Sequence, residues 1–215
     1  SAMEEGSVEL IRRYKEAAKD EGVVAEALGD NSKGFKGAEK VLEAEYEFPY
    51  LAHASMEPMN CVAQMSSDGI EMWYGCQGPT MDQYAVASAL GIKPDQVKIN
   101  TLFAGGSFGR RANKDSDFVV EAAQIARACN SDSPIKLVWT REDDTQSGYF
   151  RPMYYHKMKA GLNAEGRIVA WEHKIVGQSI ISGTAFEAKA VKNGVDSSSV
   201  EGAIELPYDF ENFTV

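Results

Sequence analysis

Cysteines and long apolar runs are both scarce in this chain. Its three cysteines, Cys61, Cys76 and Cys129, form no Cys-x-x-Cys pair, so the sequence supports neither a zinc site nor an iron–sulfur cluster. A disulfide framework is not expected from so few cysteines, and buried free thiols are the simplest interpretation. No apolar run approaches the ~20 residues of a membrane-spanning helix, so the sequence predicts no membrane span.

Basic charge is also scarce. The chain has 22 Lys and Arg against 32 Asp and Glu, a net charge of −10, which argues against a nucleic-acid partner. Residues 102–160 depart from this balance, with nine bases and seven acids. This local excess suits an anionic ligand, and the alternative is chance unevenness, since the difference is only two charges. Neither the Gly-x-Gly-x-x-Gly nor the Gly-x-x-x-x-Gly-Lys-Ser/Thr fingerprint occurs at the glycine-rich run, which excludes a Rossmann or P-loop nucleotide site there.

The N-terminal part of the 215-residue chain has a helical pattern. Apolar residues at helical spacing predict a helix over residues 7–28, interrupted near Gly22, and the run from Gly29 to Gly37 predicts a mobile loop. Residues 1–38 are therefore interpreted as a helical appendage or connector. Ser1-Ala2-Met3 is typical of the remnant of a purification tag.

Residues 39–215 alternate between strand and helix patterns and predict a partial α+β domain. Apolar and acidic residues alternate over 41–48, which predicts a strand with one buried face and one face exposed to solvent. Asp68-Gly69 indicates a hairpin between strands at 60–65 and 70–74. Further strands are expected at 97–102, 135–139, 154–162 and 167–176. Helices are expected at 80–90, from a Thr80 cap to a Gly91 stop, and at 113–129, with a buried stripe of Val119, Val120, Ala123 and Ala126.

The most informative residues are Gln77 and the run Gly105-Gly106-Ser107-Phe108-Gly109-Arg110-Arg111. Glycines remove the Cβ atoms that would keep a ligand away from the backbone. Successive N–H groups in such a turn form a concavity for an anion or an oxo group. Arg110 and Arg111 carry charge that suits phosphate.

Four motifs in order resemble the molybdopterin-binding subunit of the xanthine oxidase family, closest to the isoquinoline 1-oxidoreductase beta-subunit type. They are the stretch around Glu57-Pro58 (residues 50–63), Gln77-Gly78-Pro79-Thr80, the glycine loop of residues 105–111, and Thr140-Arg141-Glu142-Asp143-Asp144. Together they span about residues 42–176. Ser107 stands where a third glycine is usual in this family.

The resemblance implies roles for the cofactor-binding residues Gln77, Gly106, Ser107, Phe108, Gly109 and Arg110. The Gln77 amide would donate to an oxo group of molybdenum, as would the Phe108 N–H, while the Phe108 ring packs to fix the turn. Arg110 would clamp the pyrophosphate of the cofactor, and Arg111 either assists or is solvated. Ser107 adapts less readily than glycine to positive φ, although its hydroxyl adds a hydrogen-bond donor.

The geometry that follows from these roles is specific. The Gln77 side chain and the backbone of Ser107, Phe108 and Gly109 should lie close together, on an accessible loop. His53 is expected to be structural, Glu57 to be a buried hydrogen-bonded carboxylate, and the acids of residues 142–144 to cap a helix or to face solvent.

Other parts of such an enzyme are expected outside this chain. The resemblance implies a glutamate base in a Gly-x-Gly-Glu context, which the sequence lacks, together with a partner subunit that carries iron–sulfur centres. The parent would oxidise an aldehyde or hydroxylate an N-heterocycle with molybdopterin, in bacteria commonly the cytosine dinucleotide form. An upstream export signal would place it in the periplasm, and otherwise it is cytoplasmic. Two alternatives are a non-catalytic α+β assembly module whose glycine loop is only structural, and a phosphate-binding enzyme of unrelated type.

The chain by itself is expected to be catalytically silent and free of molybdenum. The catalytic base and the second cofactor loop of the resembling family are both missing from its sequence. Elemental mass spectrometry of the purified chain measures this directly, and stoichiometric molybdenum would contradict the expectation.

Overall fold

The computed structural model describes residues 6–215, so the expected tag remnant at residues 1–3 lies outside the described part of the chain. The chain divides into two compact units. Unit 1 contains the chain up to Tyr50 together with Pro152–Val215, and unit 2 is the continuous segment Leu51–Arg151. Both units combine helices with sheets, which confirms the predicted α+β class. The boundary expected at residue 38 stays a prediction.

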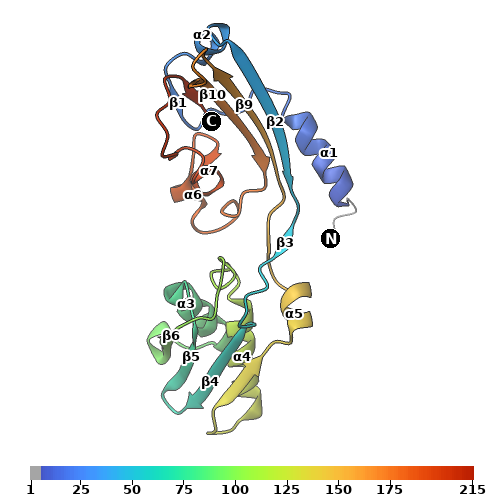
Figure 1. The fold of residues 1–215 in the computed structure, drawn as a ribbon. Coiled ribbons are helices and arrows are strands. Elements are labelled where there is room, and N and C mark those ends of the chain that lie inside the picture. The colour runs from blue at the N-terminus through green and yellow to red at the C-terminus, as the bar shows by residue number, and fades with distance from the viewer. Residues whose placement is uncertain (1–5) are drawn as a thin grey trace. The chain divides into compact units, whose positions relative to one another are not determined.

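Unit 1 is built on a five-stranded sheet (Figure 1). The strand order is β1 (Ala27–Leu28), β13 (Phe213–Thr214), β10 (Ile168–Gly177), β9 (Tyr154–Leu162) and β2 (Lys40–Phe48). All neighbouring pairs are antiparallel except β10 and β13. The other elements are α1 (Ser7–Ala17), α2 (Asn31–Lys36), α6 (Glu187–Ala190), β11 (Val191–Lys192), β12 (Val195–Asp196) and α7 (Ser197–Val200). The predicted hairpin of β9 and β10 is confirmed.

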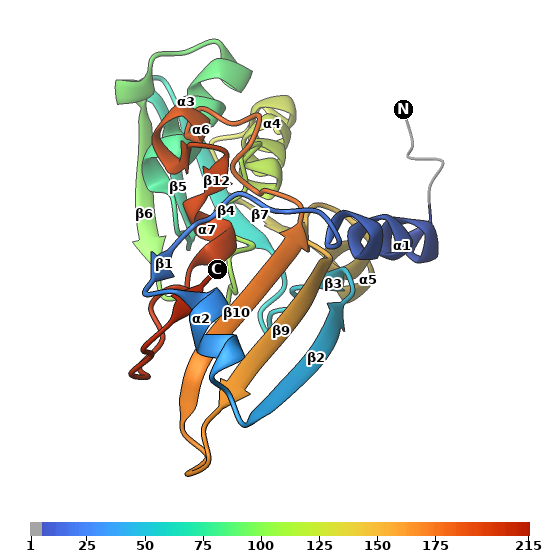
Figure 2. The same cartoon turned by 90° about the horizontal axis from the view of Figure 1, so that it is seen from above.

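The N-terminal prediction was wrong in two places. The helix expected over 7–28 ends at Ala17, because Lys174 of β10 binds the carbonyls of Ala18 and Asp20 at 3.1 and 2.7 Å and the following residues pair as a strand. The mobile loop expected over 29–37 contains α2, which lies against the sheet in Figure 2. Asp30 caps this helix by accepting from the Lys33 N–H at 3.0 Å.

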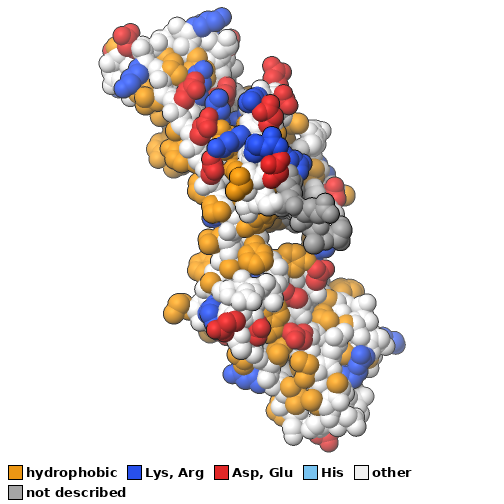
Figure 3. All heavy atoms as spheres, turned by 90° about the vertical axis from the view of Figure 1, so that its right-hand side faces the viewer, with side chains coloured by type: hydrophobic (Ala, Val, Ile, Leu, Met, Phe, Trp, Pro, Cys, Tyr) orange, Lys and Arg blue, Asp and Glu red, His pale blue; other side chains and the backbone are white. Residues whose placement is uncertain are grey.

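The strand β2 was predicted correctly, but its predicted buried face was not. Only Ala44 in β2 is partly buried, whereas Leu42 is 46% and Tyr46 48% exposed. The strand is the last in the sheet order, and among the described residues no layer covers its apolar side chains. On the α1 and β2 side of unit 1, acidic and basic side chains are interspersed (Figure 3), and Lys15 pairs with Glu47 at 2.5 Å.

Unit 2 contains the four-stranded sheet β6 (Val97–Leu102), β5 (Gly69–Gly75), β4 (Asn60–Ser66) and β7 (Ile135–Val138), in that order. Its helices are α3 (Pro79–Leu90), η1 (Pro94–Gln96), α4 (Asp117–Cys129) and α5 (Arg141–Gln146), and a short ladder joins β3 (Leu51–Ala52) to β8 (Phe150–Arg151). The core lies among the sheet, α3 and α4, and its fully buried members include Met59, Cys61, Ala63, Met72, Val86 and Ala123.

The elements predicted in unit 2 are confirmed, with shifts at their ends. Gly78 caps α3 with Pro79 in its first turn, rather than Thr80, and Gly91 ends the helix in the left-handed conformation as predicted. The helix α4 begins at Asp117, four residues later than expected. Its stripe is buried at Val119, Ala123 and Ala126 but only partly at Val120.

The predictions on cysteines and membrane spans can be compared with the described residues. All three cysteines are free, but only Cys61 is buried, and Cys129 is exposed. Within residues 6–215, no helix combines the length and apolar character needed to cross a bilayer.

Candidate functional site: a cradle of hydrogen-bond donors in unit 2

Two parallel strands bring the site residues of unit 2 together. The strands β5 and β6 are parallel and in register, with Gly75 opposite Leu102. Their carboxyl ends therefore meet at one edge of the sheet. The segment after β5 contains Gln77, and the segment after β6 contains the glycine loop of residues 105–111.

Three of the four residues at the tip of the glycine loop have the left-handed backbone conformation. The φ angles of Gly106, Phe108 and Gly109 are +99°, +56° and +97°, whereas Ser107 has no positive φ. Serine in place of the usual third glycine therefore carries no left-handed strain, contrary to the expected difference in the loop. Gly105 is needed for a close approach, since a Cβ there would lie 2.6 Å from Cβ of Glu57.

The predicted meeting of Gln77 with the loop is confirmed. Gln77 Oε1 accepts hydrogen bonds from the Ser107 hydroxyl and, at 3.2 Å, from the Arg111 backbone N–H. The loop is accessible as expected, with Gly105, Phe108 and Gly109 exposed. The geometry thus brings a side-chain amide and a glycine-rich turn to one surface.

The backbone N–H groups at the tip of the loop are free. Within the described part of the chain, nothing accepts a hydrogen bond from the N–H of Gly106, Ser107, Phe108 or Gly109. The amide nitrogen of the exposed Gln77 likewise has no acceptor among these residues. These donors form what we call the donor cradle: the N–H groups of residues 106–109 and the Gln77 amide nitrogen. Such a cradle binds acceptors and anions.

The Phe108 side chain does not pack as predicted. Its ring was expected to anchor the turn onto the core, but it is 78% exposed. The turn is instead held by the buried Arg111 behind it. The backbone N–H of Phe108 is available, whereas the ring is an apolar surface without a covering layer in unit 2.

Arg110 lies in a different place from the one its predicted role requires. A pyrophosphate clamp needs an accessible guanidinium, but Arg110 is only 2% exposed. Its two terminal nitrogens donate to both carboxylate oxygens of Asp117, at 3.1 and 2.7 Å, and its Cζ lies 5.3 Å from the centroid of the Trp139 ring. Arg110 is thus a structural residue beneath the loop, because a buried guanidinium requires a partner charge.

Arg111 is buried as well, which contradicts the alternative that it is solvated. Its side chain donates to the carbonyls of Gly106, Gly75 and Glu57 at 3.0, 3.3 and 3.1 Å, and it lies 3.2 Å from the Glu57 carboxylate. Burial lowers the pKa of Arg111, and the charge of Glu57 opposes this shift. One side chain therefore joins the end of β5, the Glu57 segment and the glycine loop.

Glu57 is a hydrogen-bonded carboxylate, as predicted, although it is only partly buried. Its two oxygens accept from Asn60 Nδ2 at 2.7 Å and from the Gly105 N–H at 2.5 Å. Partial burial acts to raise the pKa of Glu57, but the hydrogen bonds from Asn60 and Gly105 and the charge of Arg111 hold it below its usual value. An ionised carboxylate of this kind positions the loop and is a poor base.

A buried network that the sequence did not indicate lies beneath Gln77. Asp82, near the start of α3, accepts from the Tyr74 hydroxyl at 2.8 Å and from the Cys76 thiol at 3.2 Å. Burial and the hydrogen bond to Asp82 raise the pKa of Cys76 to about 11, so the thiol is protonated at neutral pH. The network fixes the residue that precedes Gln77. Its sequence signal is an acid inside an otherwise apolar helix.

Of the acids at residues 142–144, Asp143 caps a helix as predicted, whereas Asp144 is buried in an ion pair. Asp143 forms a reciprocal capping box with Thr140 at the start of α5, and Asp144 is buried against Arg141 at 2.7 Å. His53 is half-buried, and burial lowers its pKa. Residues 6–215 contain no group of three or more His, Cys, Asp or Glu side chains arranged to hold a metal ion.

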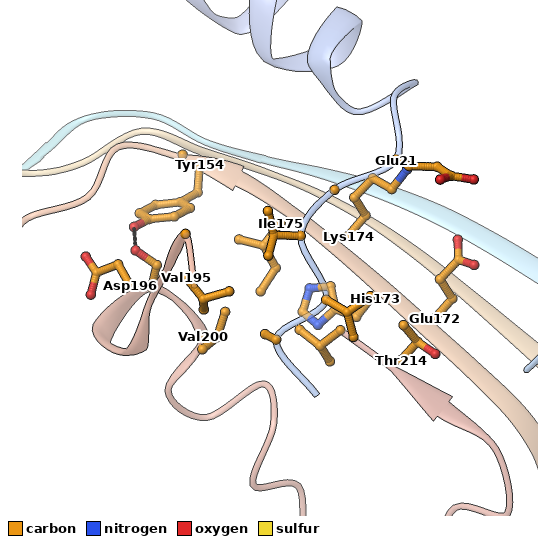
Figure 4. A pocket seen from close by; sticks show the side chains of 18 residues that line it. Glu21, Tyr154, Glu172, His173, Lys174, Ile175, Val195, Asp196, Val200 and Thr214 are labelled. Carbon is orange, nitrogen blue, oxygen red and sulfur yellow. Dashed lines mark hydrogen bonds between the residues drawn. The ribbon is translucent and has the colours of Figure 1, made fainter. Parts of the chain in front are cut away.

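Unit 1 contains a separate pocket of about 430 Å³, shown in Figure 4. It is lined largely by small and apolar side chains, among them Val23, Val195, Val200 and Ile175. The buried His173 also lines it, and its Nε2 lies 2.8 Å from His156 Nδ1, whereas its Nδ1 has no partner among the described residues. Burial, with a smaller effect of His156, lowers the pKa of His173 to about 4.

Comparison with known proteins gives the class of this chain. Residues 15–214 match the model of the molybdopterin cofactor-binding domain. The chain belongs to this family, which confirms the resemblance found in its motifs.

The individual relatives are much longer than this chain. It is 36% identical over 137 residues to the isoquinoline 1-oxidoreductase subunit beta of Brevundimonas diminuta, covering 63% of this chain and 17% of that protein. It is 31% identical over 149 residues to one subunit of a probable xanthine dehydrogenase of Bacillus subtilis, covering 69% of this chain and 20% of the relative. The fold is similar to that of the aldehyde oxidoreductase of Desulfovibrio gigas, with a TM-score of 0.64 at 21% identity over 87% of this chain and 20% of that one.

Removing the partner of Arg110 should destabilise unit 2. Asp117→Ala leaves a buried guanidinium without its carboxylate and should lower the free energy of unfolding by about 3 kcal/mol or more. Urea denaturation measures this loss. Lys98→Ala breaks an ion pair whose lysine side chain is 68% exposed and should change little. If both substitutions lowered the free energy of unfolding equally, the buried Arg110–Asp117 pair would stabilise the chain no more than an exposed ion pair does.

Acid should weaken unit 1 through His173. The folded-state pKa of about 4 lies below the unfolded value of about 6.5, so the unfolded state binds more protons between these pH values. The contribution of the neutral His173 ring to the free energy of unfolding is complete above about pH 6.5 and is lost as the pH falls towards 4. Titration of the ring by NMR gives the pKa, and His173→Gln should flatten the dependence of unfolding free energy on pH over this range. An ordinary ring pKa near 6.5 would contradict the prediction.

Proposed function

We propose that this chain forms one wall of the cofactor site in the catalytic subunit of a molybdenum hydroxylase. The observation that carries the proposal is the donor cradle. Four backbone N–H groups and one side-chain amide meet at one sheet edge without acceptors among the described residues. A protein surface that offers only donors is suited to a ligand that offers only acceptors.

The residues of the cradle fit the molybdenum end of a molybdopterin cofactor. Its oxygen atoms are hydrogen-bond acceptors, and the cradle supplies rigid donors for them. When bound, the cofactor supplies the redox chemistry that oxidises the substrate. The part of this chain is to bind and orient it: Gln77 through its amide nitrogen, Phe108 through its backbone N–H, and Gly106, Ser107 and Gly109 through the backbone of the turn. The buried Arg110 supports the loop from below and is not assigned to the phosphate groups.

The finer assignments rest on relatives. Two relatives are named as subunits of an isoquinoline oxidoreductase and a xanthine dehydrogenase, which supports an N-heterocycle as substrate and a partner subunit in the parent protein. An aldehyde as the alternative substrate and iron–sulfur centres on the partner are proposed from the resemblance of the motifs. The cytosine dinucleotide form of molybdopterin is proposed because bacterial members of the resembling branch commonly use it. The chain spans about a fifth of the length of these relatives. Because its sequence contains no Gly-x-Gly-Glu, the proposal puts the catalytic base in another part of the parent protein.

The assembly-module alternative makes a different prediction. The exposed rings of Phe103 and Phe108 would suit contact with another protein surface. An apolar contact, however, would leave the free N–H groups of the cradle without acceptors, which is costly once water is excluded. The alternative therefore accounts for the rings but not for the cradle.

In the full-length parent, Gln77→Ala should lower kcat/KM while the protein stays folded. Loss of one preorganised donor typically costs about 10²–10³ in rate, roughly 3–4 kcal/mol, and a contact at the edge of a metal site costs less. Steady-state kinetics measure the loss, with molybdenum content determined on the same samples. Gln124→Ala is a matched control, because Gln124 is an exposed glutamine of α4 away from the loop.

The substitution Gly106→Val tests whether the loop is needed for molybdenum binding, as distinct from the catalytic rate. Gly106 has a φ of +99°, a conformation that a β-branched residue does not adopt without strain, so the turn should distort and molybdenum loading should fail. Full activity of Gln77→Ala together with full molybdenum content of Gly106→Val would show that the loop is merely structural.

A further inference from the structure

The orientation of the Gln77 amide is determined by the backbone. The atom of Gln77 that lies 3.2 Å from the Arg111 nitrogen must be an acceptor, since a backbone N–H can only donate. The carbonyl oxygen of the amide therefore faces Arg111. The NH₂ group, on the other side of the planar amide, is left for a ligand.

The Ser107 hydroxyl reinforces this orientation. It accepts from the same Arg111 N–H at 3.1 Å, so its own proton is free to be donated, and Gln77 Oε1 is the acceptor it contacts. Gln77 Oε1 thus receives two hydrogen bonds, one from the backbone and one from a side chain. A glycine at residue 107 would leave only the first of them.

We infer that Ser107 is a positioning residue, which holds the carbonyl of Gln77 inward so that its amide nitrogen faces the cofactor. The inference rests on the proposed function for the identity of the ligand, but the positioning itself is a property of this chain alone. Two hydrogen bonds to one oxygen restrict an exposed side chain that would otherwise sample several rotamers. A preorganised donor costs less reorganisation when the ligand binds.

A simpler role for Ser107 makes a different prediction. The hydroxyl could serve only to accept from the Arg111 N–H and close the turn. In that case, removal of the Ser107 hydroxyl would not change the mobility of the Gln77 side chain. The mobility of the Gln77 side-chain amide therefore distinguishes the two roles.

The first experiment measures this mobility in the 215-residue chain, without cofactor. The heteronuclear NOE of the Gln77 side-chain NH₂ is compared with two internal references. Gln83 is a fixed amide, with its nitrogen donating to the Val97 carbonyl at 2.9 Å, and Gln124 is an exposed amide of α4. Gln77 should resemble Gln83 in the unmodified chain and shift towards Gln124 in Ser107→Ala. Ser107→Thr keeps the hydroxyl and should restore the order.

The second experiment measures the consequence in the full-length parent. Ser107→Ala should lower kcat about fivefold, the effect expected for one neutral hydrogen bond, with unchanged molybdenum content, and Ser107→Thr should recover most of the loss. An unchanged Gln77 NOE in Ser107→Ala would overturn the inference, whatever the kinetics.

The kinetic outcomes separate the two proposals. A loss in Gln77→Ala but none in Ser107→Ala would overturn the role of Ser107 and leave the proposed function standing. No loss in either variant would overturn the role of Ser107 and of the Gln77 amide, and the molybdenum content of Gly106→Val would then decide whether the loop binds the cofactor.

Discussion

The buried guanidinium of Arg111 is the interaction on which the site depends. A charge taken out of water is costly unless its N–H groups find acceptors, and here they find them on three separate segments, at Glu57, Gly75 and Gly106. The end of β5, the Glu57 segment and the glycine loop are therefore fixed relative to one another. Since a side chain holds the loop from within, the loop can keep its shape without using the N–H groups at its tip.

Buried side chains hold the loop while the N–H groups at its tip stay free, and this separation also determines the electrostatics of the site. The charged groups nearest the loop are neutralised inside unit 2, Arg110 by Asp117 and Arg111 by Glu57. What remains exposed is a set of neutral donors. A cradle of this kind selects its ligand by hydrogen-bond direction as well as by charge, so a ligand that presents acceptor oxygens fits it.

The sequence predicted most elements of this structure and the meeting of Gln77 with the glycine loop. It could do so because hairpin turns, helix stops and parallel strand ends have local signals, such as Asp68-Gly69 and Gly91. It did not predict the burial of Arg110, whose partner Asp117 lies seven residues further along the chain, nor the helix α2, which depends on close packing of Gly34 against Ala170. It also predicted a buried face for β2 that no described element covers. These errors share a cause: burial is decided by tertiary packing, whereas composition suggests only which residues tolerate it.

The exposed edge of β2 has a consequence for how the chain behaves in solution. A nine-residue outer strand offers unpaired backbone groups to any other strand that approaches, which is the usual route to sheet-to-sheet aggregation. The strand carries Glu43, Glu45 and Glu47 at alternate positions, on one side of the ribbon. Two such edges brought together would set like charges against each other. The glutamates that alternate along the strand therefore disfavour the growth of a sheet from this edge.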